Sequence, residues 1–78
     1  MERNVTFTYD EVLALKKAAA QATGGYIHFH DACGGQSFSF DQPDPTTKAF
    51  VEDYFAKQGM TAVFTPDGTD FTVRKGSV

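Results

Sequence analysis

Hydrophobic and polar residues alternate along much of the chain, and two stretches with helical spacing interrupt the alternation. Alternation is typical of strands with one buried face, because successive strand side chains point to opposite sides of a sheet. It predicts strands at residues 4–9, 25–32, 36–41, 61–65 and 69–74. The helical spacing predicts one helix that ends near Thr23 and a second from Pro45 to about Gln58.

Both predicted helices have recognisable start signals. Thr8 and Glu11 match the capping box, in which each side chain accepts a hydrogen bond from the other residue's backbone N–H, although Asp10 is an alternative cap. Asp44 precedes Pro45, and proline is favoured in the first turn because that turn needs no N–H donor. These signals indicate that the two helix starts are encoded locally.

The order of elements is therefore β-α-β-β-α-β-β. Two helices on one face of an antiparallel or mixed sheet form an α+β, two-layer α/β sandwich. We expect a ferredoxin-like plait with an added C-terminal hairpin strand, and other plaits of two helices and one sheet remain open. In that hairpin Val63 competes with Ala62 and Phe64 for the inward position, so its register is open.

Composition supports a folded single domain over residues 1–78. Hydrophobic residues make up 41% of the 78 residues, and eight phenylalanines supply bulk for a core. The net charge is −3 and the seven basic residues are scattered, which argues against nucleic acid as a partner. No apolar leader and no membrane-spanning run of about 20 residues is visible in the sequence.

The single cysteine, Cys33, excludes an intrachain disulfide framework and zinc sites built from several cysteines of one chain. A domain without disulfides fits a reducing compartment, so we expect a cytoplasmic protein.

If the helices cover the phenylalanine face of the sheet, the opposite face is polar and open. A surface of this kind suits a wet, weak interface with a protein partner, and we expect a monomer or a weak homodimer. We expect the contact residues of this face to include Tyr26, Asp31, Ser37, Ser39, Asp41 and Arg74.

His28 and His30 lie on the same side of their predicted strand, about 6.6 Å apart, and Cys33 follows at a glycine turn. Two imidazoles and a thiolate would suit Zn²⁺ or a similar metal. This set supplies three ligands, so a fourth would come from water, Asp31, Asp41 or a second chain. The alternative is that both histidines are ordinary solvated side chains.

Cys33 is also a candidate reactive thiol. Backbone N–H groups around Gly34 and Gly35 could form an anion-binding concavity that, with His30 nearby, would favour a thiolate. A reactive thiol at Cys33 would suit a redox or sulfur-carrier role. The alternative is an ordinary cysteine packed in a turn. Catalysis by Cys33 with a histidine base is disfavoured, because a chain this small offers little to exclude water.

The residues Asp31-Ala32-Cys33-Gly34-Gly35-Gln36 resemble a motif of very short uncharacterised bacterial proteins, the "RDAC"-type family. This sequence has His30 where that motif has arginine. The resemblance implies no activity, and it marks Asp31, Cys33 and the two glycines as positions to test.

The sequence therefore predicts a small soluble binding or accessory protein of bacterial type, with a candidate site at the His28/His30/Cys33 hairpin. The alternative is a thiol-based redox or sulfur-carrier protein that uses Cys33. Neither reading requires an enzyme.

Overall fold

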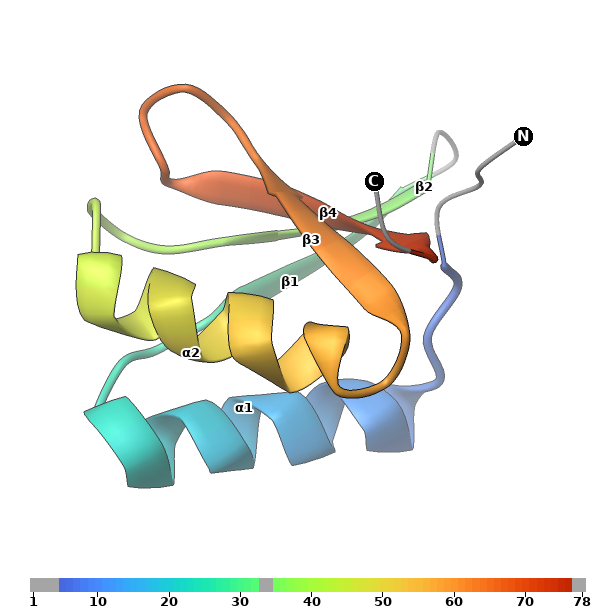
Figure 1. Ribbon diagram of the computed structural model, residues 1–78, viewed down its shortest axis with the longest axis horizontal. Helices are drawn as coiled ribbons and strands as arrows, with labels where there is room; N and C mark the ends of the chain where they lie inside the picture. Colours follow the sequence, from blue (N-terminus) through green and yellow to red (C-terminus); the bar gives the residue numbers. More distant parts are fainter. Residues whose placement is uncertain (1–4, 33–34, 77–78) are drawn as a thin grey trace.

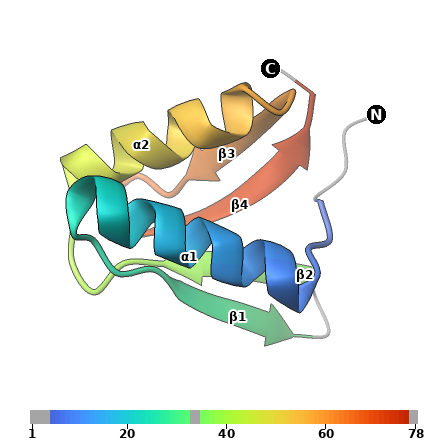
Figure 2. The ribbon, with the colours of Figure 1, turned by 90° about the horizontal axis from the view of Figure 1, so that it is seen from below.

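The computed structural model describes residues 5–32 and 35–76. These residues form two layers, a four-stranded antiparallel sheet and a pair of helices that cover one of its faces (Figure 1). Figure 2 shows both helices side by side in front of the sheet, so the other face carries no helix of the described chain. In chain order the elements are α1 (Tyr9–Thr23), β1 (His28–Ala32), β2 (Gly35–Ser39), α2 (Pro45–Ala56), β3 (Met60–Phe64) and β4 (Asp70–Lys75).

The capping signals read from the sequence are confirmed. Thr8 is the N-cap of α1, its hydroxyl accepts from the N–H of Glu11, and the Glu11 carboxylate accepts from the N–H of Thr8. Asp44 caps α2 and Pro45 is its first residue. The second helix ends at Ala56, two residues before the predicted end near Gln58.

The sheet order is β1-β2-β4-β3, and its two hairpins diverge from each other. β2 and β4 pair at only two positions, Phe38 with Phe71 and Ser39 with Asp70. The open register of the C-terminal hairpin is now resolved, because Ala62 pairs with the buried Val73. Val63 therefore lies on the face that the helices leave bare.

The strand predicted over residues 4–9 does not form in the described residues 5–9. Tyr9 already belongs to α1, because the capping box starts the helix there. Residues 5–8 lie between the diverging hairpins, where Val5 donates its N–H to the Val73 carbonyl. The Gln36 side chain of β2 accepts from the N–H of Phe7 at 2.6 Å and donates to its carbonyl. A side-chain amide thus replaces the backbone ladder, and the element order is α-β-β-α-β-β.

Phenylalanine rings hold the two hairpins together at the point where they meet. Phe38 and Phe71 are paired across β2 and β4, and their rings are stacked with centroids 4.9 Å apart. The ring of Phe7 contacts those of Phe38 and Phe55, so the N-terminal segment closes the same core. Burial of these rings is the main source of stability in a domain this small.

A buried hydroxyl joins the end of α1 to the start of α2. Thr47 is fully buried, and its Oγ1 donates to Asp44 Oδ2 at 2.7 Å. Thr47 Oγ1 also lies 2.9 Å from Thr23 Oγ1, whose own hydroxyl donates to the Ala19 carbonyl in the last turn of α1. The bond from Thr47 is the largest cause of a pKa of Asp44 below its usual value of 3.8.

The turn between β3 and β4 is held by Asp67. Its Oδ1 accepts from the Thr65 hydroxyl and from both the N–H and the hydroxyl of Thr69. These bonds, first that from the Thr65 side chain, lower the pKa of Asp67 below 3.8. Gly68 has a φ of 75°, a conformation that glycine adopts without strain.

Neither helix of the described chain is long and apolar enough to cross a membrane.

Candidate functional site

The face of the sheet opposite the helices carries mostly polar side chains. Strand alternation places the phenylalanines of β2 and β4 towards the helices, where Phe38 and Phe71 are buried. The same alternation brings His28 and His30 of β1 beside the serines of β2, with His28 opposite Ser39 and His30 opposite Ser37. We call this surface the open face.

His28 is held in place from both sides. Its Nε2 lies 2.6 Å from Asp41 Oδ1, and the two side chains are 37% and 76% exposed. The Tyr26 ring packs edge-on against the imidazole, with centroids 4.6 Å apart. A carboxylate only accepts hydrogen bonds, so Nε2 carries the proton and Nδ1 of the neutral ring is left as an acceptor.

His30 also bonds to a side chain that follows on the chain beyond its direct partner, here a hydroxyl that can donate or accept. Its Nε2 lies 2.8 Å from Ser39 Oγ. Each histidine therefore reaches past its direct partner to the next residue on the same side of the hairpin, since Ser39 is the partner of His28 and Asp41 lies two residues beyond it. The two imidazoles lean in one direction, and Asp41 and Ser39 fix them. The sequence marked both residues as part of this face but did not pair them with the histidines.

A shallow hollow of about 270 Å³ adjoins the histidines on the open face. Ser37, the direct partner of His30, lines it together with Thr72 of β4 and Val63 of β3. Sequence reasoning missed this hollow, because it left the register of Val63 open. The pairing of Val63 with Thr72 supplies an apolar floor within a polar surface.

Three other residues of the predicted site, Arg74, Asp31 and Cys33, differ in where they lie. Arg74 alternates with Val73 and so shares the side of Thr72 on β4, where its side chain is exposed. Asp31 pairs with Gln36 and alternates with His30, which places it on the side of the helices at the edge of the sheet. Cys33 lies outside the described residues.

The predicted metal ligands are brought together only in part. His28 and His30 share one side of β1, and Asp41 contacts the first of them. Within residues 5–32 and 35–76, no group of three or more His, Cys, Asp or Glu side chains is placed to hold a metal ion. A three-ligand site would need Cys33 or a second chain.

Comparisons of this chain with models of protein families, with curated proteins and with solved structures give no significant match. The resemblance of residues 31–36 to the RDAC-type motif therefore stays a prediction, and the functional reading rests on the geometry of the open face.

Proposed function

We propose that this protein is a small binding module that contacts a protein partner through the open face, with His28, His30 and the adjoining hollow at the centre of the contact. The observation that carries the proposal is the pair of bonds that fix both imidazoles, His28 to Asp41 and His30 to Ser39. A contact surface whose side chains are already ordered loses less conformational entropy when it binds.

The chemistry of this surface suits binding better than catalysis. Its hollow is shallow, so a reacting group there would stay in contact with water, which weakens electrostatic stabilisation of a transition state. Hydroxyls, two imidazoles and the apolar Val63 match the mixed polar and apolar character of transient interfaces. A weak homodimer through the same face is the special case in which the partner is a second copy.

Site-specific photo-crosslinking tests the proposal. A photoreactive p-benzoylphenylalanine replaces Thr72 on the open face, and as a matched control it replaces Thr46, an exposed threonine of α2. We expect adducts of one defined mass from position 72 in cells that produce the chain naturally. The double substitution His28→Ala and His30→Ala should remove these adducts while leaving the fold unchanged.

Equal adducts from position 46, or none from position 72, would contradict the proposal. An adduct of twice the chain mass would identify the partner as a second copy, and sedimentation at the same concentration would then show the dimer.

Zinc at His28, His30 and Cys33 is the second candidate, favoured by the unprotonated Nδ1 that the Asp41 bond leaves on His28. Titration with ZnCl₂ should then shift the imidazole signals of both histidines, and the Cys33→Ser variant should reduce the shifts.

A thiol-based role for Cys33 is tested by measuring its alkylation rate as a function of pH, since an activated thiol has a pKa below about 8.5.

We also propose that residues 5–8 take the place of the first strand in a ferredoxin-like plait. The backbone bond from Val5 to Val73 and the clamp of Gln36 on Phe7 support this assignment.

A cytoplasmic location stays part of the proposal, because a chain with a single cysteine forms no intrachain disulfide and fits a reducing compartment.

A further inference from the structure

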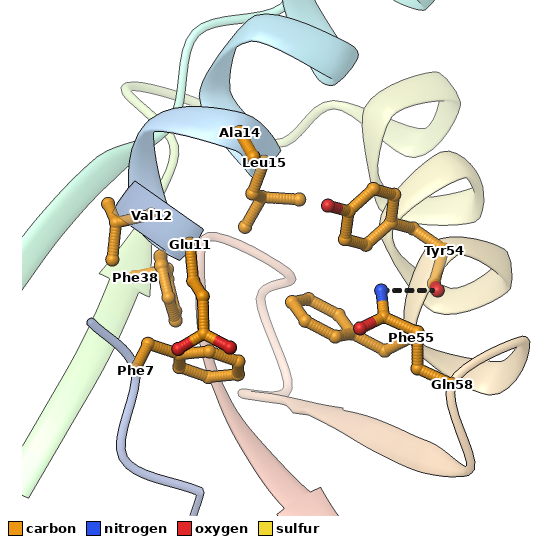
Figure 3. Close-up of a pocket in the computed structure, with 9 residues that line it drawn as sticks. All are labelled: Phe7, Glu11, Val12, Ala14, Leu15, Phe38, Tyr54, Phe55 and Gln58. Atoms are coloured by element: carbon orange, nitrogen blue, oxygen red, sulfur yellow. Dashed lines mark hydrogen bonds between the residues drawn. The ribbon is translucent and has the colours of Figure 1, made fainter. Parts of the chain in front are cut away.

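A second, separate site lies in the helical layer. A cavity of about 90 Å³ opens between α1, α2 and the N-terminal segment, at the end of the molecule where α1 begins and α2 ends. Figure 3 shows the nine side chains that line it, which come from both helices, from β2, from residue 7 and from Gln58 just after α2. This cavity lies on the side of the sheet that the helices cover, opposite the open face.

The inner walls of the cavity are apolar. Leu15, Phe38 and Phe55 are each no more than 2% exposed, and Phe7 closes one side as a half-buried ring. An apolar cavity of roughly 150 Å³ in another protein stays dry and binds benzene. The cavity between α1 and α2 is smaller, but it is partly open to solvent, so an aromatic ring would enter it with its substituent in the mouth.

The mouth of the cavity is lined with oxygen atoms. Glu11 uses Oε1 to accept from the N–H of Thr8, which leaves the other carboxylate oxygen for a ligand. Gln58 donates its Nε2 to the Tyr54 carbonyl at 3.2 Å, which leaves its own carbonyl oxygen. The Tyr54 hydroxyl points across the opening towards α1 (Figure 3). Such a mouth offers acceptors to a group that donates hydrogen bonds.

The charge of the cavity lining decides which hydrogen-bond donors are favoured at the mouth. Among the described residues, the lining includes a carboxylate and no lysine or arginine, and the whole chain has a net charge of −3. A cation is therefore favoured at the mouth and an anion is disfavoured. An ammonium group has three N–H donors, enough for the carboxylate and one further oxygen.

We propose that this cavity binds a small aromatic amine, with the ring between Leu15, Phe38 and Phe55 and the ammonium group at Glu11. The ring gains by leaving water, and the ammonium group keeps hydrogen-bond partners at the surface. This proposal is independent of the open face, because the two sites share no residue.

The probe is benzylamine, and the measurement is a ¹H–¹⁵N NMR titration of the full chain. We expect saturable shifts at the amides of Leu15, Phe38 and Phe55 with a dissociation constant in the millimolar range. Benzoate, which has the same ring and the opposite charge, should bind at least tenfold more weakly. Benzyl alcohol, which is neutral, should lie between the two.

Two variants separate charge recognition from filling of the cavity. Glu11→Gln keeps the capping box, because glutamine caps as glutamate does, and removes only the charge. It should weaken benzylamine about tenfold and leave benzyl alcohol unchanged. Ala14→Leu places a branched side chain at the opening and should block both ligands. Ala22→Leu, an equal change at an exposed site of α1 outside the lining, should block neither.

Three results would overturn the proposal. The first is the absence of saturable shifts at the lining amides up to about 20 mM benzylamine. The second is equal binding of benzoate and benzylamine, which would show that Glu11 does not select the ligand. The third is unchanged binding by Ala14→Leu, which would place the ligand elsewhere. Unfolding curves of each variant exclude loss of fold as the cause of lost binding.

Discussion

The buried Thr47 hydroxyl offers the most defined test of the fold, because Thr47→Val removes one oxygen and changes the side-chain shape very little. The hydroxyl donates to the Asp44 carboxylate at 2.7 Å and lies 2.9 Å from Thr23 Oγ1. Valine has no hydroxyl, so Asp44 keeps only its bonds to backbone N–H groups, among them that of Thr47 at 3.1 Å. The substitution therefore isolates the hydroxyl from the rest of the helix cap.

The size of the effect follows from the bond to Asp44. A hydrogen bond to a charged group contributes about 1.5–3 kcal/mol. Asp44 is well solvated, which puts this contribution at its low end, and buried valine recovers part of the loss because it is more apolar. We expect the free energy of unfolding to fall by about 1–2 kcal/mol. In a domain of this size that lowers the melting temperature by roughly 4–16 °C.

The assay is urea unfolding followed by circular dichroism at pH 6 and pH 2.5. The folded-state pKa of Asp44 is lowered, so its contribution is present above about pH 3.8 and is lost as the pH falls through the folded-state value. The destabilisation by Thr47→Val should therefore shrink at pH 2.5. Thr46→Val is the matched control, an exposed neighbour with the same chemical change. Equal losses in the two variants, or a loss that does not depend on pH, would refute the reasoning.

Three further predictions use other contacts. Gly25→Ala places a Cβ in steric clash with Thr47 Oγ1 and should lower stability in urea by about 1–3 kcal/mol, and by less in a Thr47→Ala background; equal loss in both backgrounds would argue against the clash. Gln36→Ala removes both bonds to the Phe7 backbone and should speed amide exchange at Phe7 by up to about tenfold; unchanged exchange would show that the clamp does not hold the segment. Asp67→Asn should reduce stability more at pH 6 than at pH 2.5, because the pKa of Asp67 is lowered in the fold and its contribution is lost as the pH falls through the folded-state value; an equal loss at both pH values would contradict that role.

Local signals predicted the helices and both hairpins because each signal acts within a few residues. Thr8 and Glu11 cap α1 through bonds across three residues, and Asp44 with Pro45 starts α2 in the same way. The strand predicted at 4–9 failed for a non-local reason. Its alternating pattern is real, but the capping box takes Tyr9 into the helix, and Gln36, distant in sequence, occupies the ladder position beside Phe7.

The candidate site was predicted as a set of residues but not as a set of contacts. Strand alternation correctly put His28 and His30 on one side, whereas their bonds to Asp41 and Ser39 depend on the hairpin register and on the lean of both rings. The hollow beside them required the pairing of Val63 with Thr72, and the sequence pattern predicted that hairpin but left its register open. The cavity between the helices arises from packing of α1 against α2 and had no sequence signal.

The functional proposal depends most directly on the fixed position of the His28 ring. Long-range ¹H–¹⁵N correlation of the imidazole resolves its tautomer, once the pH is high enough that the signals stop moving. The bond to Asp41 predicts a His28 ring protonated at Nε2 alone, and Asp41→Ala should convert it to a mixture of tautomers. A mixture in the unchanged protein, or a spectrum that Asp41→Ala does not alter, would contradict an ordered contact surface on the open face.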